Sequence, residues 1–129
     1  MRSRLRRLHV DGRAYIWSAR VGHVVGPDGL CHRCVRLRVW GAGRNGRALQ
    51  VDLLSEAPPG PWGDPCATDG CFPEAADVRT VIEYGLRHGW QPDQLGGTHL
   101  LTADPPGEAL TLPHFVATDL LRAADATAR

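Results

Sequence analysis

The chain has 129 residues and the composition of an ordinary globular protein, with 43% hydrophobic and 22% charged residues, which bounds it at one domain with a single core. No apolar run is long enough to cross a membrane, and the arginine-rich N-terminus lacks the apolar stretch of a secretory signal. We therefore expect one domain over residues 1–129, located in the cytoplasm, where thiols stay reduced.

The two halves of the chain carry opposite charge. Residues 1–50 hold eleven arginines against Asp11 and Asp28, a net charge of +9, and residues 51–129 hold four arginines against twelve acidic residues, a net charge of −8. Such asymmetry is typical of proteins with a nucleic-acid or other anionic partner. It also fits a fold in which the halves face and neutralise each other, and in a small single domain this second interpretation is favoured.

The first elements in chain order are two predicted strands. Asp11-Gly12 separates segments of alternating polarity at residues 7–10 and 13–21, and this dipeptide is the strongest short signal for a β-hairpin. Side chains two residues apart share one face of a strand. The sequence therefore predicts a hairpin with one apolar face.

Two further strands are predicted at residues 34–40 and 48–54. The turn between them is rich in glycine, and we expect its tip at Asn45-Gly46. Alternation turns the apolar residues of both segments inward and leaves polar ones such as Asp52 on the outside. One covered face and one wet face are expected of an antiparallel sheet.

The second half begins with a proline- and glycine-rich loop at residues 55–73, which shows neither helical nor strand periodicity. Residues 74–90 then carry an apolar stripe with helical spacing, and Gly89 is placed to end that helix. A short strand is expected at residues 98–103 and a second helix at residues 112–126. The order of elements predicts an α+β fold: an antiparallel β-meander of four to five strands with one or two helices packed on one face.

Four cysteines form the most specific pattern in the sequence. Cys31 and Cys34 open the third strand, and Cys66 and Cys71 lie in the loop after the fourth. A meander brings both pairs to the same end of the sheet, where four thiolates would suit a structural Zn²⁺ ion. The alternatives are buried packing thiols, a disulfide or a redox pair.

A second candidate site lies on the outward face of the third strand, where Arg36, Arg38 and Trp40 alternate. Basic residues interleaved with an aromatic one on a sheet bind single-stranded nucleic acid through phosphate contacts and stacking. The alternative is a solvated outer face, or one covered by the acidic second half of the chain.

Two more residues are candidates for a pocket. His99 follows two glycines that allow close backbone approach, although a half-buried, hydrogen-bonded strand histidine explains it as well. Trp62 stands in the proline-rich loop, either as an anchor to the core or as a binding handle.

Two stretches, VDGRAYIW at residues 10–17 and VIEYGLRHGWQPDQLGGTHLL at residues 81–101, continued by LPHFVATDLL at 112–121, resemble a family of small uncharacterised actinobacterial proteins. The resemblance covers the first hairpin and most of residues 76–121. It implies no activity, and it does not bear on the cysteines.

The sequence therefore favours a non-enzymatic binding protein, an adaptor or immunity-like module for protein–protein interaction, with a structural zinc as a stabilising element. The alternative is a nucleic-acid-binding protein that uses the basic N-terminal sheet face. A third class is a small enzyme, which requires His99 or His114 in a concave pocket beside a carboxylate such as Asp104 or Asp119.

Overall fold

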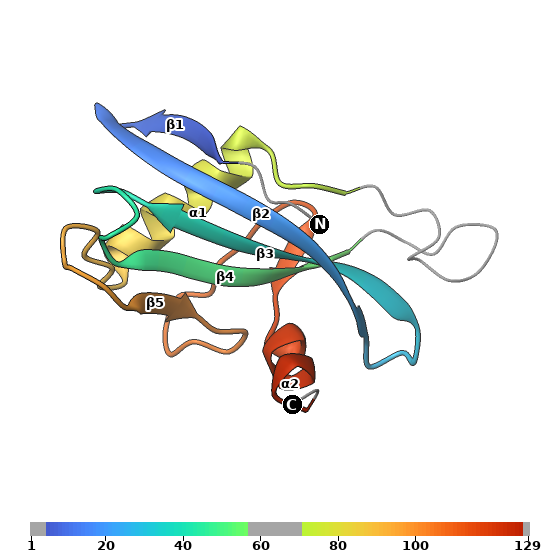
Figure 1. Cartoon of the computed structure of the whole chain (residues 1–129). Helices are drawn as coiled ribbons and strands as arrows, with labels where there is room; N and C mark the ends of the chain where they lie inside the picture. Colours follow the sequence, from blue (N-terminus) through green and yellow to red (C-terminus); the bar gives the residue numbers. More distant parts are fainter. Residues whose placement is uncertain (1–4, 57–70, 128–129) are drawn as a thin grey trace.

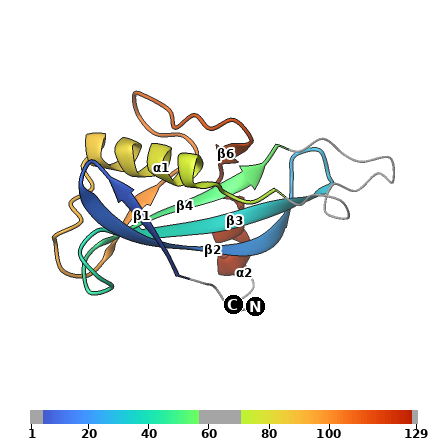
Figure 2. The same cartoon turned by 90° about the horizontal axis from the view of Figure 1, so that it is seen from above.

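The computed structural model describes residues 5–56 and 71–127 and shows one mixed sheet with a helix on each face (Figures 1 and 2). The sheet order is β1-β2-β3-β4-β5, and β6 pairs with β4 beyond the end of β5. The elements are β1 (Arg6–Val10), β2 (Arg13–Val25), β3 (Cys31–Trp40), β4 (Ala48–Ser55), α1 (Ala75–Arg87), β5 (Thr98–Leu101), β6 (Phe115–Ala117) and α2 (Leu120–Thr127). The predicted α+β class with a largely antiparallel sheet is confirmed. Neither helix in the described part of the chain is long and apolar enough to span a membrane.

The meander of β1 to β4 is antiparallel throughout, as the alternation predicted. Asp11 and Gly12 both have positive φ, 50° and 80°, so they form the expected tight hairpin turn. The turn between β3 and β4 differs from the prediction. Its closing hydrogen bond runs from the Gly46 N–H to the Gly43 oxygen, so its tip is one residue earlier than expected.

The end of the chain departs from the prediction in two ways. β5 is a strand, but it runs parallel to β4, because the whole of α1 lies between them as a crossover. The expected helix at residues 112–126 is wrong in its first half, where β6 pairs with β4 instead. The open edge of β4 offers backbone partners that outweigh local helix propensity. Thr118 accepts the Leu120 N–H at 3.1 Å, and the helix begins only there.

Helix α1 covers the apolar face of the sheet. Buried residues of the helix, including Val81 and Ile82, pack against the inward residues of β3 and β4 in one core cluster. Gly85 lies so close to β4 that a Cβ atom there would stand 2.7 Å from a Leu49 methyl carbon. The helix ends as predicted: Gly89 has φ 98°, and the Trp90 N–H returns to the Gly85 oxygen at 2.9 Å.

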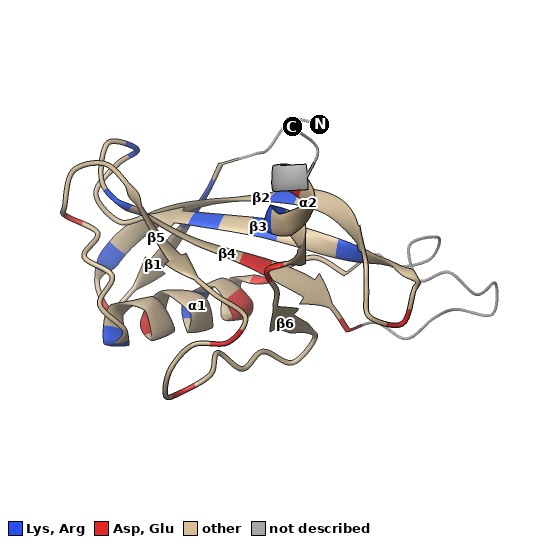
Figure 3. Cartoon of the chain, turned by 90° about the horizontal axis from the view of Figure 1, so that it is seen from below, with Lys and Arg blue, Asp and Glu red and all other residues tan. Residues whose placement is uncertain are grey.

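Helix α2 lies on the opposite face of the sheet (Figures 2 and 3). The expectation of helices on one face only is therefore wrong for α2. The absent side chain of Gly22 makes room for Leu121, whose methyl carbon would stand 3.4 Å from a Cβ atom at Gly22. The outward face of the meander is thus partly covered, and its polar residues meet a helix as well as solvent.

Candidate anion-binding site

The outward face of the sheet carries a groove lined mainly by arginine. Strand alternation places Arg36, Arg38 and Trp40 on the face opposite the buried Val35, Leu37 and Val39, as predicted. Together with neighbours from β2, β4 and the β3–β4 turn, they line a cavity of about 260 Å³. We call this cavity the arginine groove; its lining residues are Ser18, Arg20, Arg36, Arg38, Trp40, Arg44 and Gln50.

One indole ring holds two guanidinium groups in this groove. Trp40 is only 5% exposed, and its ring centroid lies 5.3 Å from Arg38 Cζ and 4.9 Å from Arg44 Cζ. Both distances are within the range of cation–π attraction. The ring therefore gathers two like charges in one place and limits their freedom before any ligand arrives.

Arg38 has no counter-ion in the described part of the chain. Its Nη2 donates to Thr98 Oγ1 at 3.3 Å, and its buried Nε has no hydrogen-bond partner there. Burial, followed by repulsion from Arg36 and Arg44, lowers the pKa of Arg38 from its usual value. A guanidinium is charged at any physiological pH, so the groove keeps an excess of positive charge.

Arg20 and Arg44 are also without an ion pair to any carboxylate that the structure describes. Ser18 and Gln50 flank Arg38 on the neighbouring strands and offer a hydroxyl and an amide. The groove thus combines uncompensated guanidinium groups with neutral donors and acceptors, which is the donor set that phosphate oxygens prefer.

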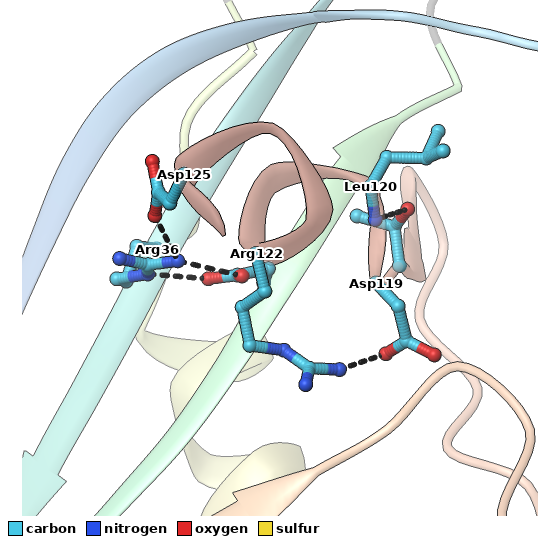
Figure 4. Close-up of polar contacts among 7 residues, drawn as sticks. Arg36, Asp119, Leu120, Arg122 and Asp125 are labelled. Atoms are coloured by element: carbon cyan, nitrogen blue, oxygen red, sulfur yellow. Dashed lines mark hydrogen bonds and ion pairs between the residues drawn. The ribbon is translucent and has the colours of Figure 1, made fainter. Parts of the chain in front are cut away.

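Arg36 has a different environment (Figure 4). Its Nε and Nη2 donate to the two carboxylate oxygens of Asp52 at 2.9 and 3.1 Å, and Nη2 also lies 3.0 Å from Asp125 of α2. Hydrogen bonding to Asp52 is the largest cause of the raised pKa of Arg36. Asp52 is buried, so the expectation of a wet position for it is wrong, because α2 covers this part of the face. Of the three predicted residues, Arg36 serves to attach the helix.

Ion pairs also join the oppositely charged halves of the chain. Besides the pairs of Arg36, Arg13 of β2 binds Asp93 beyond α1. In Figure 3 most of the basic residues lie on the meander, α1 carries both basic and acidic residues, and further acidic residues mark β4 and the connecting segments. The halves therefore neutralise each other in part, and the arginine groove is where neutralisation by the described residues is incomplete.

The four cysteines of the predicted zinc site have different environments. Cys34 is a fully buried thiol on the outward face, and burial raises its pKa to about 12. Cys31 is disulfide-bonded. Cys71 packs against the core cluster on the α1 side of the sheet, and Cys66 lies outside the described residues.

Zinc binding and the cytoplasmic location both stay predictions. In the ranges 5–56 and 71–127 no group of three or more His, Cys, Asp or Glu side chains is placed to hold a metal ion. A disulfide at Cys31 is uncommon in a reducing compartment, so the redox state of that residue bears on the location.

Of the two predicted pocket residues, His99 is described and Trp62 is not. His99 is half-buried on β5 and lines a cavity of about 180 Å³ with Tyr84 and His88. Burial, then the charges of Arg47 and His88, lowers the pKa of His99. His114 lines another cavity, of about 630 Å³, whose lining also includes Asp77. Neither lining includes Asp104 or Asp119, the carboxylates that the enzyme hypothesis named.

Sequence reasoning missed Arg20, Arg44, Ser18 and Gln50 as members of the groove. The register of β2 and β4 against β3 was the signal for three of them, since Ser18 and Gln50 flank Arg38 and Arg20 flanks Arg36. No comparable signal existed for Arg44, whose position depends on the conformation of the β3–β4 turn.

Comparison with known proteins adds no family to this description. The chain matches no protein-family model, no curated protein and no solved structure at a significant level.

Proposed function

We propose that this protein is a non-enzymatic binding protein that holds single-stranded nucleic acid in the arginine groove. The observation that carries the proposal is the pair Arg38 and Arg44, which share the ring of Trp40 and lack a carboxylate partner in the described part of the chain. A phosphate diester supplies the missing negative charge and accepts from the fork of a guanidinium.

The form of the groove favours a single strand. Phosphate contacts are worth most where the cations are already gathered, and flexible single strands adapt their backbone to such a groove. The indole of Trp40 is covered, so an unstacked base would lie against a guanidinium plane, a contact that RNA-binding proteins also use. We therefore expect little base preference and a strong dependence on salt.

The decisive experiment is a fluorescence-anisotropy titration with a labelled oligonucleotide of about twelve nucleotides, as single strand and as duplex. The test variant is Arg38→Ala/Arg44→Ala. The matched control is Arg79→Ala/Arg87→Ala, which removes the same charge from exposed positions of α1. Loss of affinity in the test variant alone supports the proposal. Equal loss in both variants, no binding, or equal binding of the duplex rejects it.

A protein partner is the second candidate function. It is favoured by an adjoining surface, the long outer edge of β2, which shares Arg20 with the arginine groove but does not require the arginine pair on Trp40. A cytoplasmic location suits both proposals.

A further inference from the structure

Strand β2 is much longer than the strand that covers its outer edge. β2 runs over Arg13–Val25, whereas β1 pairs only with residues 13–17 of it. Among the described residues, 18–25 are paired on one side only, with β3, through the register Ser18↔Arg38 to Val25↔Cys31. Figure 1 shows β2 continuing well past β1 towards the β2–β3 turn.

The backbone of residues 18–25 presents hydrogen-bonding groups along this edge. In a two-residue hairpin the flanking residues, here Val10 and Arg13, exchange hydrogen bonds, so the odd-numbered residues of β2 direct their N–H and C=O groups to the β1 side. The register with β3 is unbroken, so the same rule continues outward at Ala19, Val21, His23 and Val25. No hydrogen bond from the described residues reaches these groups from outside the sheet.

In the part of the chain that the structure describes, few of the usual protections against strand addition are present at this edge. Residues 18–25 contain no proline, and their regular register excludes a bulge. Val25 is 65% exposed at the end of the strand. An open edge of this length is a template for pairing with another extended chain, which makes backbone hydrogen bonds along it.

A small cavity beside the edge adds side-chain recognition. It measures about 250 Å³ and lies on the α2 side of the sheet, where Gly22 and Leu121 both line it. Arg20 and Arg36 are among its lining residues. Asp125 already balances Arg36, but no described carboxylate balances Arg20. An acidic side chain of an added strand would enter this cavity and pair with Arg20.

The charge of the edge also disfavours a second copy of the chain as the occupant. Antiparallel self-pairing about Val21 would place the two Arg20 side chains on the same face, diagonal to each other and without a carboxylate between them. A partner segment with an acidic residue removes this repulsion.

We propose that residues 18–25 of β2 bind an extended acidic segment of a partner protein as an additional strand of the sheet. Main-chain hydrogen bonds to the outward groups at Val21 and His23 supply affinity. An acidic side chain placed beside Gly22 and paired with Arg20 supplies specificity.

The test is a selection of random peptides of about twelve residues displayed on phage, with the full chain as bait. Enriched peptides should combine β-branched residues with an acidic residue at a fixed position. Each is then synthesised with a fluorophore, and its affinity is measured for the unchanged protein and for three variants.

The first variant is His23→Pro, which removes an outward N–H where a strand tolerates proline, and it is matched by His23→Ala. We expect at least about tenfold weaker binding for His23→Pro, little change for His23→Ala, and about tenfold weaker binding for Arg20→Glu. Equal binding of His23→Pro and His23→Ala overturns the proposal. So does a failure to enrich any peptide, or a dimer in solution that His23→Pro dissociates.

A second measurement does not depend on a substitution at the edge. Hydrogen exchange of the unchanged protein should show new protection at the amides of Val21 and His23 when the peptide is bound, and protection elsewhere alone contradicts strand addition. The variant Arg38→Ala/Arg44→Ala should bind the peptide normally. This outcome separates the partner proposal from the nucleic-acid proposal, because each can fail while the other stands.

Discussion

Asp52 binds Arg36 with both carboxylate oxygens from the adjacent strand, and the buried carboxylate is satisfied only while the guanidinium stays in place. The same guanidinium reaches Asp125 of α2. One cross-strand pair therefore links the meander to the C-terminal helix and decides which arginines of the outward face are available to a ligand.

Removing the carboxylate should be costly. We expect Asp52→Ala to lower the free energy of unfolding by about 3–5 kcal/mol, because it leaves Arg36 without its main partner in a partly buried position. Urea denaturation of the variant measures this change. The control is Asp125→Ala, which removes the more exposed partner and should cost less than about 1 kcal/mol. A similar decrease in the free energy of unfolding for the two variants would contradict the inference that Asp52 is the main partner of Arg36.

The nucleic-acid proposal makes a quantitative prediction for salt. Three arginines of the groove, Arg20, Arg38 and Arg44, lack an ion pair with any described carboxylate, so a single strand should make about three phosphate contacts there. The logarithm of the association constant should then fall against the logarithm of salt concentration with a slope of about −2.

Each arginine removed should reduce that slope by about 0.7. Anisotropy titrations between about 50 and 200 mM salt measure the slopes for the unchanged protein and for Arg38→Ala. A slope that is the same in the variant would show that Arg38 makes no phosphate contact.

How much of this was predictable differs from residue to residue. The period-two pattern of β3 placed Arg38 and Trp40 on one face correctly, because side-chain alternation is a local property of the backbone. The pairing of Arg36 with Asp125 was not predictable, since it depends on where α2 packs. In that position Leu121 of α2 packs over Gly22, and the only sequence signal for this contact is the absent side chain of the glycine.

The wrong prediction of a helix at residues 112–117 has the same kind of explanation. Its sequence favours a helix as readily as a strand, and the choice is made by the free edge of β4 beside Ser55. The parallel direction of β5 likewise depends on where α1 crosses the sheet. Pairing between segments that are distant in the sequence has no local sequence pattern from which it can be predicted.

The rate at which Cys34 is alkylated tests the environment of the first cysteine pair. Its pKa of about 12, raised by burial, leaves almost no thiolate at neutral pH. We expect the native protein to react very slowly with iodoacetamide at Cys34 and quickly after denaturation, as mass spectrometry of the alkylated peptides would show. Treatment with EDTA should not change the native rate if burial alone protects the thiol. A marked increase with EDTA would instead support the predicted zinc site, and metal analysis of the same preparation would identify the ion.

The lowered pKa of His99 predicts how the free energy of unfolding changes with pH. Its folded-state pKa lies below the ordinary 6.5, because burial and the charges of Arg47 and His88 oppose protonation. Between the two pKa values the unfolded chain binds more protons than the folded one, so the free energy of unfolding should decrease as pH falls below about 6.5 and be constant above it as far as His99 is concerned.

The neighbouring pair of His88 and Glu108 affects the stability of the fold in a different pH range. Hydrogen bonding to His88 lowers the pKa of the Glu108 carboxyl below 4.5, so that group changes charge at more acidic pH. Urea denaturation at several pH values above 4.5 therefore avoids most of the titration of Glu108, and the comparison with His99→Gln separates the contribution of His99 from those of the other five histidines. The variant should lose part of the pH dependence seen in the unchanged protein below pH 6.5. If both proteins lose stability with the same slope, another group is responsible, and His99 keeps an ordinary pKa on its strand.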